Sequence, residues 1–196
     1  MGIENKVIAY EIDAENNIAN TVRYTLSSNP SVYDIEKCPV CIGRTIAHVL
    51  ISPNHNIITK KGFKALEQAL EFWTPLYNVN CRNGCSGKLT RIRTPNEQVF
   101  IELDVRHHQN INQSLTCLLG DFPVVLRLGP KDQATSSEYR LAGVVEHLPG
   151  HYVAHCMRIG GHWQKFNSMD RKVMSSNMKT CVEPHLAIYV RRSNKN

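Results

Sequence analysis

Apolar residues in the first half of the chain recur at helical spacing over one short stretch. Within residues 62–73 they fall three or four positions apart, at Phe63, Leu66, Ala69, Leu70 and Trp73. This spacing predicts an amphipathic helix over Gly62–Trp73, and Pro75 ends it. A second short helix is predicted over Ile42–Leu50.

The second half of the chain changes to a period of two. Val99, Ile101 and Leu103 alternate with Phe100, Glu102 and Asp104. Similar short segments rich in Val, Tyr, Phe and Leu follow at Phe122–Leu128, Tyr139–Glu146, Tyr152–Arg158, Trp163–Phe166 and His185–Val190. Such segments, with no long helix between them, predict an antiparallel sheet. The expected fold class is therefore α+β.

Two consecutive glycines, Gly160 and Gly161, predict a hairpin turn inside this sheet. If Arg158 pairs with His162, then His151 lies diagonally across from Asn167 on the same face. A histidine that acts as a base for a thiol needs its second ring nitrogen held by an acceptor, which Asn can supply. Residue types alone favour the simpler explanation, in which His151 caps a strand and Asn167 closes it.

Composition and charge narrow the class of protein. The chain has 196 residues and an ordinary globular composition, which predicts one domain or one domain with a small insert. No apolar run approaches the roughly 20 residues of a membrane span, and the N-terminus lacks a secretory signal pattern. We expect an intracellular protein, cytoplasmic or nuclear. A net charge of +6 favours binding to acidic partners.

Four of the seven cysteines form two close pairs, Cys38/Cys41 and Cys81/Cys85. Each pair is short enough for one turn to present two sulfurs to a single ion, and tetrahedral zinc binds four such ligands. Pro39 favours a tight turn within the first pair. The sequence therefore predicts a structural zinc site in a reducing compartment rather than a disulfide framework.

Other uses of these residues stay open at this point. The four thiols could be unrelated buried or surface groups, because free Cys packs as a small hydrophobe. His48 or His55 could replace one of the ligands. Cys41 could instead be a nucleophile, because a helix starting at Ile42 would stabilise its thiolate.

The chain resembles the ubiquitin-specific protease family over about residues 97–191. The motifs that carry the resemblance are Tyr139–Val145 followed by His147, Gly150–Ala154, Trp163-x-x-Phe166-Asn167, and a closing strand over Ala187–Val190. The segment Asp121–Leu126 also resembles the strand that enters the family's palm. The ubiquitin-specific proteases form peptidase group C19. The resemblance to them implies that His151 is the catalytic histidine and that Asn167 orients it.

The resemblance implies a papain-like cysteine-protease palm of antiparallel strands with a helical, zinc-bearing finger region. Expected parts are an N-terminal segment (1–37), a cysteine-bearing finger-like region with a helix (38–96) and a palm-like sheet (97–196). The chain departs from the family in two respects. It has no Asn-x-Cys-Tyr or Asn-x-Cys-Trp box to supply a nucleophile, and Ser168 follows Asn167 where the family commonly has Asp.

These features predict a ubiquitin-specific-protease-like domain that recognises ubiquitin or a ubiquitin-like modifier. If active, it removes the modifier by thiol-dependent cleavage, with Cys41 or an upstream cysteine as nucleophile. The missing cysteine box favours a truncated or inactive form, a pseudoenzyme that only binds the modifier. The alternative is a zinc-stabilised basic module that binds nucleic acid, supported by the net charge and the cysteine pairs.

Overall fold

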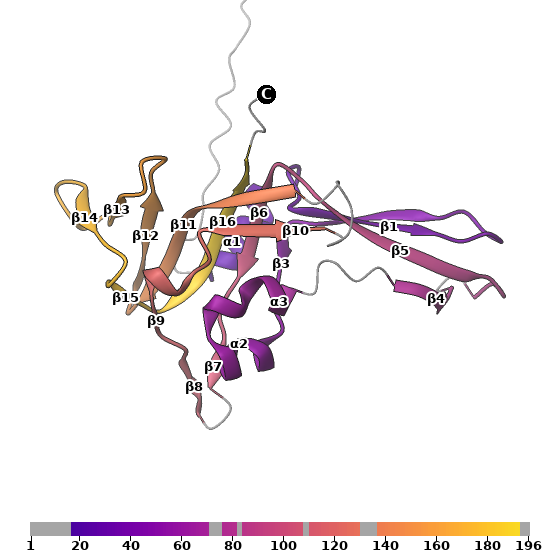
Figure 1. The fold of residues 1–196 in the computed structure, drawn as a ribbon, viewed down its shortest axis with the longest axis horizontal. Coiled ribbons are helices and arrows are strands. Elements are labelled where there is room, and N and C mark those ends of the chain that lie inside the picture. The colour runs from indigo at the N-terminus through magenta and orange to yellow at the C-terminus, as the bar shows by residue number, and fades with distance from the viewer. Residues whose placement is uncertain (1–16, 71–75, 82–83, 108–109, 130–136, 193–196) are drawn as a thin grey trace, which may run out of the picture.

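The computed structural model describes residues 17–70, 76–81, 84–107, 110–129 and 137–192. They form two main sheets, two small strand pairs and a few short helices. In Figure 1 the smaller main sheet extends away from the body of the molecule, with β1 and β5 side by side and β4 toward its far end. We call this the finger sheet (β2-β1-β5-β4) and the larger one the palm sheet.

The finger sheet is antiparallel throughout. Its strands are β1 (Val32–Lys37), β2 (Arg44–His48), β4 (Leu76–Asn80) and β5 (Lys88–Pro95). Alternate side chains of β1 are buried, and two of them are the acids Asp34 and Glu36. Buried carboxylates are costly unless paired, so the sheet requires cations on the flanking strands.

Those cations lie directly across the strand pairs. Asp34 faces Arg93, with an Nε–Oδ1 distance of 2.8 Å, and Glu36 faces both Arg91 and Arg44, with Nε–carboxylate distances of 2.8 and 2.6 Å. Burial alone would raise the pKa of Asp34, but the hydrogen bonds and charge of Arg93 outweigh it and lower that pKa. The Arg44 hydrogen bond is the main cause that lowers the pKa of Glu36. Both acids are therefore held as carboxylates.

The palm sheet has the strand order β14-β13-β12-β11-β16-β6-β3, and β10 also pairs with β11. All of its pairs are antiparallel except the parallel β3–β6 pair. Its strands are β3 (Leu50–Ile51), β6 (Gln98–Glu102), β10 (Val125–Leu128), β11 (Ser137–Leu148), β12 (His151–Met157), β13 (Trp163–Phe166), β14 (Met174–Ser176) and β16 (Pro184–Arg191). The separate small pairs join β7 (Arg106–His107) to β8 (Asn110–Ser114) and β9 (Cys117–Leu118) to β15 (Cys181–Val182).

The main hydrophobic core joins the palm sheet to the short helices. The helical elements are α1 (Ile18–Thr25), α2 (His55–Lys61), η1 (Phe63–Ala65), α3 (Leu66–Leu70) and η2 (Leu119–Asp121). Phe63 and Leu66 are buried in the same cluster as Ile101 and Leu126 of the sheet, and the ring centroids of Phe63 and Phe122 lie 5.1 Å apart. The helices thus stabilise the palm rather than the finger sheet.

The predicted helix over Gly62–Trp73 is present in part. Gly62 ends α2 with φ +74°, a conformation that glycine adopts readily, and the chain then continues as η1 and α3. Within the described residues, the apolar stripe is buried as the spacing predicts. Trp73 lies outside the described residues. Helix α2 was not predicted from the sequence. Asn54 caps its N-terminus, since its Oδ1 atom accepts from the backbone N–H groups of Asn56 and Ile57.

The helix predicted over Ile42–Leu50 is wrong. Arg44–His48 forms β2, which pairs with all but the last residue of β1, and Leu50 begins β3. The cross-strand partners of β2 outweigh its weak local helical tendency, because strand pairing satisfies its backbone groups.

The predicted hairpin register is confirmed. Arg158 donates its backbone N–H to the carbonyl of His162 at 2.9 Å, and Met157 pairs with Trp163 in the adjoining ladder. Gly161 occupies the turn with φ +83°, as the glycine pair predicts. The other predicted palm strands also form, with shifts of a few residues at their ends.

Two features cross the expected boundaries between parts of the chain. β1 lies before residue 38 but belongs to the finger sheet, and residues 55–70 fall in the expected finger-like region but pack with the palm core. Residues 1–16 of the expected N-terminal segment lie outside the described residues. Among the described helices, none has the length and apolar character needed to cross a membrane.

Candidate metal centre and histidine hairpin

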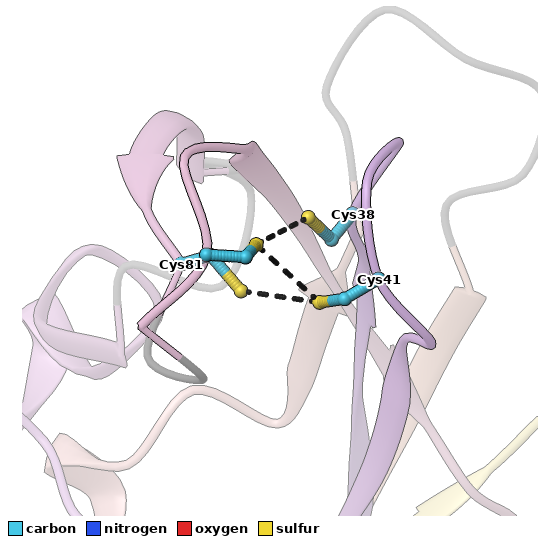
Figure 2. Close-up of side chains that lie close together, drawn as sticks. Cys38, Cys41 and Cys81 are labelled. Carbon is cyan, nitrogen blue, oxygen red and sulfur yellow. Dashed lines mark hydrogen bonds between the residues drawn. The ribbon is translucent and has the colours of Figure 1, made fainter.

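The four paired cysteines meet at one end of the finger sheet. Cys38 and Cys41 lie in the turn that joins β1 to β2, and Cys81 and Cys85 lie between β4 and β5. The Sγ atoms of Cys38 and Cys85 are 3.6 Å apart, those of Cys41 and Cys81 are 3.5 Å apart, and those of Cys41 and Cys85 are 3.6 Å apart. Figure 2 shows the two turns presenting their sulfurs to a common centre.

This arrangement fits a structural zinc ion. In a tetrahedral site with Zn–S bonds of about 2.3 Å, neighbouring sulfurs lie about 3.8 Å apart, close to the distances found here. The cluster is partly buried, and the backbone N–H groups of Val40 and Cys41 lower the pKa of the Cys38 thiol to about 7. A lowered pKa favours the thiolate, which is the form that binds metal.

The histidines considered as substitute ligands lie elsewhere. The Nε2 atom of His48 is 3.0 Å from Oδ2 of Asp34, and His55 begins α2. Within the part of the chain that the structure describes, the metal-binding group at this end of the finger sheet consists of cysteines alone. The cluster therefore offers a closed set of four sulfur ligands.

The structure removes the basis for a nucleophilic Cys41. That role required a helix starting at Ile42, and the segment after Gly43 is strand β2 instead. Burial raises the pKa of Cys117 on β9 to about 12 and also raises the pKa of Cys156 on β12, which disfavours the thiolate form of both.

His151 begins β12 directly after the turn at Pro149 and Gly150. Its Nδ1 atom lies 3.4 Å from the carbonyl oxygen of Pro149, and its Nε2 atom is buried without a hydrogen-bond partner. The carbonyl oxygen of Pro149 can accept a hydrogen bond from Nδ1 when that nitrogen carries the proton. The catalytic role of His151 stays a prediction.

Asn167 follows the last residue of β13 and organises a turn. Its Oδ1 atom accepts from the N–H of Met169 at 3.0 Å, and its carbonyl accepts from Asp170 at 3.0 Å. Among the described residues no hydrogen bond joins Asn167 to His151, because the β12–β13 ladder ends at the Ala154–Phe166 pair. The orienting role of Asn167 remains a prediction.

Two polar clusters of the palm sheet were not predicted. In the first, the buried His155 contacts Oε1 of Glu146 through Nε2 at 2.8 Å and Oγ of Ser176 through Nδ1 at 3.1 Å. The sequence signals for this cluster are Glu146 and the two histidines of β12, His151 and His155. They become informative only with the strand register, because the partners come from β11, β12 and β14.

The second cluster consists of His147, Glu183 and His185. It lies where β11 and β16 pair, and the backbone N–H of His147 donates to the carbonyl of Glu183 at 3.0 Å. Burial lowers the pKa of His185, so its imidazole is neutral near pH 7. The residue pattern Glu-x-His at 183–185 was the only local sequence signal.

Comparison with known proteins gives a weak sequence match and a clear fold match. No known family profile matches the chain. A curated Drosophila melanogaster protein, the 120.7 kDa protein in the NOF-FB transposable element, is 25% identical over 123 residues, which is 56% of this chain and 11% of that protein.

Two solved structures of the SAGA DUB module match the fold of this chain. One solved structure of Ubp8, Sgf11, Sus1 and Sgf73 bound to monoubiquitin matches with a TM-score of 0.52 and 21% identity, over 84% of this chain and 40% of that one. Another, with a shortened Sgf11, matches with a TM-score of 0.54 and 20% identity, over 90% of this chain and 47% of that one. The chain thus spans less than half the length of these matched chains. Its antiparallel palm and finger sheets have a ubiquitin-specific-protease-like fold, as the resemblance predicts.

Proposed function

We propose that this chain is a ubiquitin-specific-protease-like domain that binds ubiquitin or a ubiquitin-like modifier. The observation that carries the proposal is the match of its palm and finger sheets to a DUB module that was solved with monoubiquitin. We further propose a structural zinc ion on Cys38, Cys41, Cys81 and Cys85. This ion would link two turns from distant parts of the chain and so fix the end of the finger sheet.

Exposed apolar side chains support a protein partner. Val40, Ile42 and Tyr77 are exposed around the cysteine end of the finger sheet, and Ile159 and Met169 are exposed beside the β12–β13 hairpin. Ile42 and Ile159 are each 91% exposed. Grouped exposed apolar residues are typical of protein interaction sites.

An active form would use His151 and Asn167. The thiolate of a cysteine would attack the carbonyl carbon of the modifier's C-terminal glycine in the isopeptide bond. His151 would then deliver a proton to the departing amine. Water would then release the modifier from the thioester, with His151 as base. We favour a form that binds the modifier without cleaving it, because burial suppresses the thiolates of Cys117 and Cys156 and the nucleophilic role of Cys41 has lost its basis.

The nucleic-acid alternative has less support. Arg44, Arg91 and Arg93 of the finger sheet are paired with the buried acids Asp34 and Glu36. Phosphate binding depends on cations that can replace counterions, and these three already neutralise carboxylates. These three arginines therefore add little to the cationic surface available to nucleic acid.

A pair of titrations separates the two functions. Fluorescence anisotropy of the full chain with labelled monoubiquitin is expected to show saturable binding. Random-sequence duplex DNA, titrated under the same conditions at several salt concentrations, serves as the comparison. Saturable DNA binding with a steep salt dependence, together with no response to ubiquitin, would overturn the proposal in favour of the alternative.

A ubiquitin probe with a thiol-reactive C-terminus tests activity separately. We expect ubiquitin binding without covalent labelling. Labelling that disappears in both His151→Ala and a single Cys→Ser variant would contradict the inactive form and would identify the nucleophile. The matched control is His162→Ala, because His162 is exposed at the hairpin turn.

A further inference from the structure

A second group of metal-binding side chains lies within the palm sheet, apart from the cysteines. His147 is on β11, His185 is on β16, and Glu183 directly precedes β16. The Oε1 atom of Glu183 lies 3.6 Å from Nε2 of His185 and 3.8 Å from Nδ1 of His147. One ring nitrogen from each histidine and one carboxylate oxygen therefore surround the same small space.

Among the described residues, neither ring nitrogen of His185 has a partner within hydrogen-bond distance, although its side chain is only 7% exposed. A buried imidazole without partners is unfavourable, and such groups are rare in folded proteins. The nearby acids do not satisfy it, since Glu183 is 3.6 Å away and Oδ1 of Asp104 is 3.9 Å away. Both distances exceed an ordinary hydrogen bond.

The rings themselves are held in place. The imidazoles of His147 and His185 stack with centroids 4.8 Å apart and an interplanar angle of 21°. The ring of Tyr152 packs against both, at centroid distances of 5.2 and 5.8 Å. Held rings keep the nitrogens near one position, which reduces the entropy lost when they bind an ion.

We propose that Nδ1 of His147, Oε1 of Glu183 and Nε2 of His185 bind a zinc ion. Tetrahedral zinc with bonds of about 2.0 to 2.2 Å places neighbouring nitrogen and oxygen ligands about 3.3 to 3.6 Å apart. The 3.6 Å distance between Glu183 and His185 already lies at the upper end of that range, and the 3.8 Å distance between Glu183 and His147 needs only a small contraction to reach it. Two histidines and one carboxylate leave a fourth position for water or for a donor from a partner.

Asp104 lies at the edge of this site as an outer partner. Its Oδ2 atom accepts from Arg106 at 2.8 Å, and its Oδ1 atom is 3.4 Å from Oγ of Ser114. These contacts fix the carboxylate beside His185 and leave the three inner residues to bind the ion. The Oδ1 atom of Asp104 lies 3.9 Å from the same Nε2 atom of His185 that faces Glu183, so Asp104 is a further oxygen at the edge of the site and does not hold the other ring nitrogen.

Metal content of the full chain tests the proposal. The protein is stripped with a chelator, reloaded with zinc, desalted and analysed by mass spectrometry for metal per chain. We expect Glu183→Gln and His147→Gln each to lose one zinc ion relative to the unaltered chain. Both side chains are more than a third exposed, so these variants avoid the folding risk of changing buried His185. His162→Gln is the matched control and is expected to keep the full content.

A cysteine variant separates this site from the finger sheet. In Cys41→Ser/Cys81→Ser, the histidine site is expected to keep its ion, and cobalt bound there is expected to lack the intense thiolate charge-transfer absorption. The proposal is overturned if Glu183→Gln and His147→Gln both retain the metal content of the unaltered chain. Metal content is measured without ubiquitin, so the result tests the histidine site separately from the proposed function.

Discussion

A Cβ atom added to Gly87 would lie 2.5 Å from the Sγ atom of Cys38. The backbone of the segment after Cys85 therefore passes directly against a sulfur of the four-cysteine cluster. Only a residue without a side chain allows this approach, and the close passage brings Cys85 within 3.6 Å of Cys38.

Gly87→Ala is predicted to weaken zinc binding at the cysteines. The added methyl group must push the backbone or Cys38 away, and misplaced surroundings of a metal ligand typically reduce affinity by about 10- to 100-fold. Competition with a chromogenic chelator measures the change. Ser86→Ala is the control, because Ser86 is exposed in the same turn, and equal affinities for the two variants would contradict the prediction.

Arg91→Ala is predicted to destabilise the finger sheet. It removes one of the two arginines that neutralise Glu36, whose side chain is only 5% exposed. Leaving a buried carboxylate partly unpaired costs about 1 to 3 kcal/mol of unfolding free energy. Urea denaturation measures this loss of unfolding free energy. Arg127→Ala is the control because the Arg127–Glu138 pair is largely exposed. A loss no larger than that of the control would argue against the pairing.

The same acids predict a loss of stability in acid. The folded pKa values of Asp34 and Glu36 lie below their ordinary values of 3.8 and 4.5, so the unfolded chain binds protons more readily. Their contribution is complete above pH 4.5 and declines as the pH falls through their lower folded values. Unfolding free energies from pH 7 to pH 3 are predicted to fall less steeply in Asp34→Asn. Zinc content is followed in parallel, and Asp170→Asn serves as an exposed control; identical slopes for all three proteins would refute this account.

His155 and Glu146 are predicted to be energetically coupled within the palm sheet. Both are buried, and replacing either one leaves the other without its partner at 2.8 Å. Removing one member of a buried pair costs about 3 to 5 kcal/mol, whereas removing both costs less than the sum. Urea denaturation of His155→Gln, Glu146→Gln and the double variant measures the coupling. Additive losses would show that the two side chains act independently.

The sequence predicts the palm better than the finger sheet. Burial alternates along β10 and β12, and the glycine pair at 160–161 fixes the register that sets His155 opposite Lys165. In the finger sheet, one buried face carries Asp34 and Glu36, so the usual apolar signal is absent from β1. Strand pairing with arginines, rather than hydrophobic alternation, makes that segment a strand.

The candidate sites divide in the same way. The cysteine cluster is visible in the sequence because each turn contributes two ligands at short spacing. The cluster of His147, Glu183 and His185 combines two strands that are distant along the chain, so it becomes visible only from the β11–β16 register. The proposed contact of His151 with Asn167 depends on side-chain direction after a ladder has ended, which residue spacing does not determine.

Calorimetric titration of the zinc-loaded full chain with monoubiquitin tests the central claim most directly when it is repeated with Cys41→Ser/Cys81→Ser. The account predicts saturable one-to-one binding by the unaltered chain and weaker binding by the variant, because the zinc ion orders the end of the finger sheet. An unaltered chain that carries zinc and gives no binding to ubiquitin or to ubiquitin-like modifiers would contradict it.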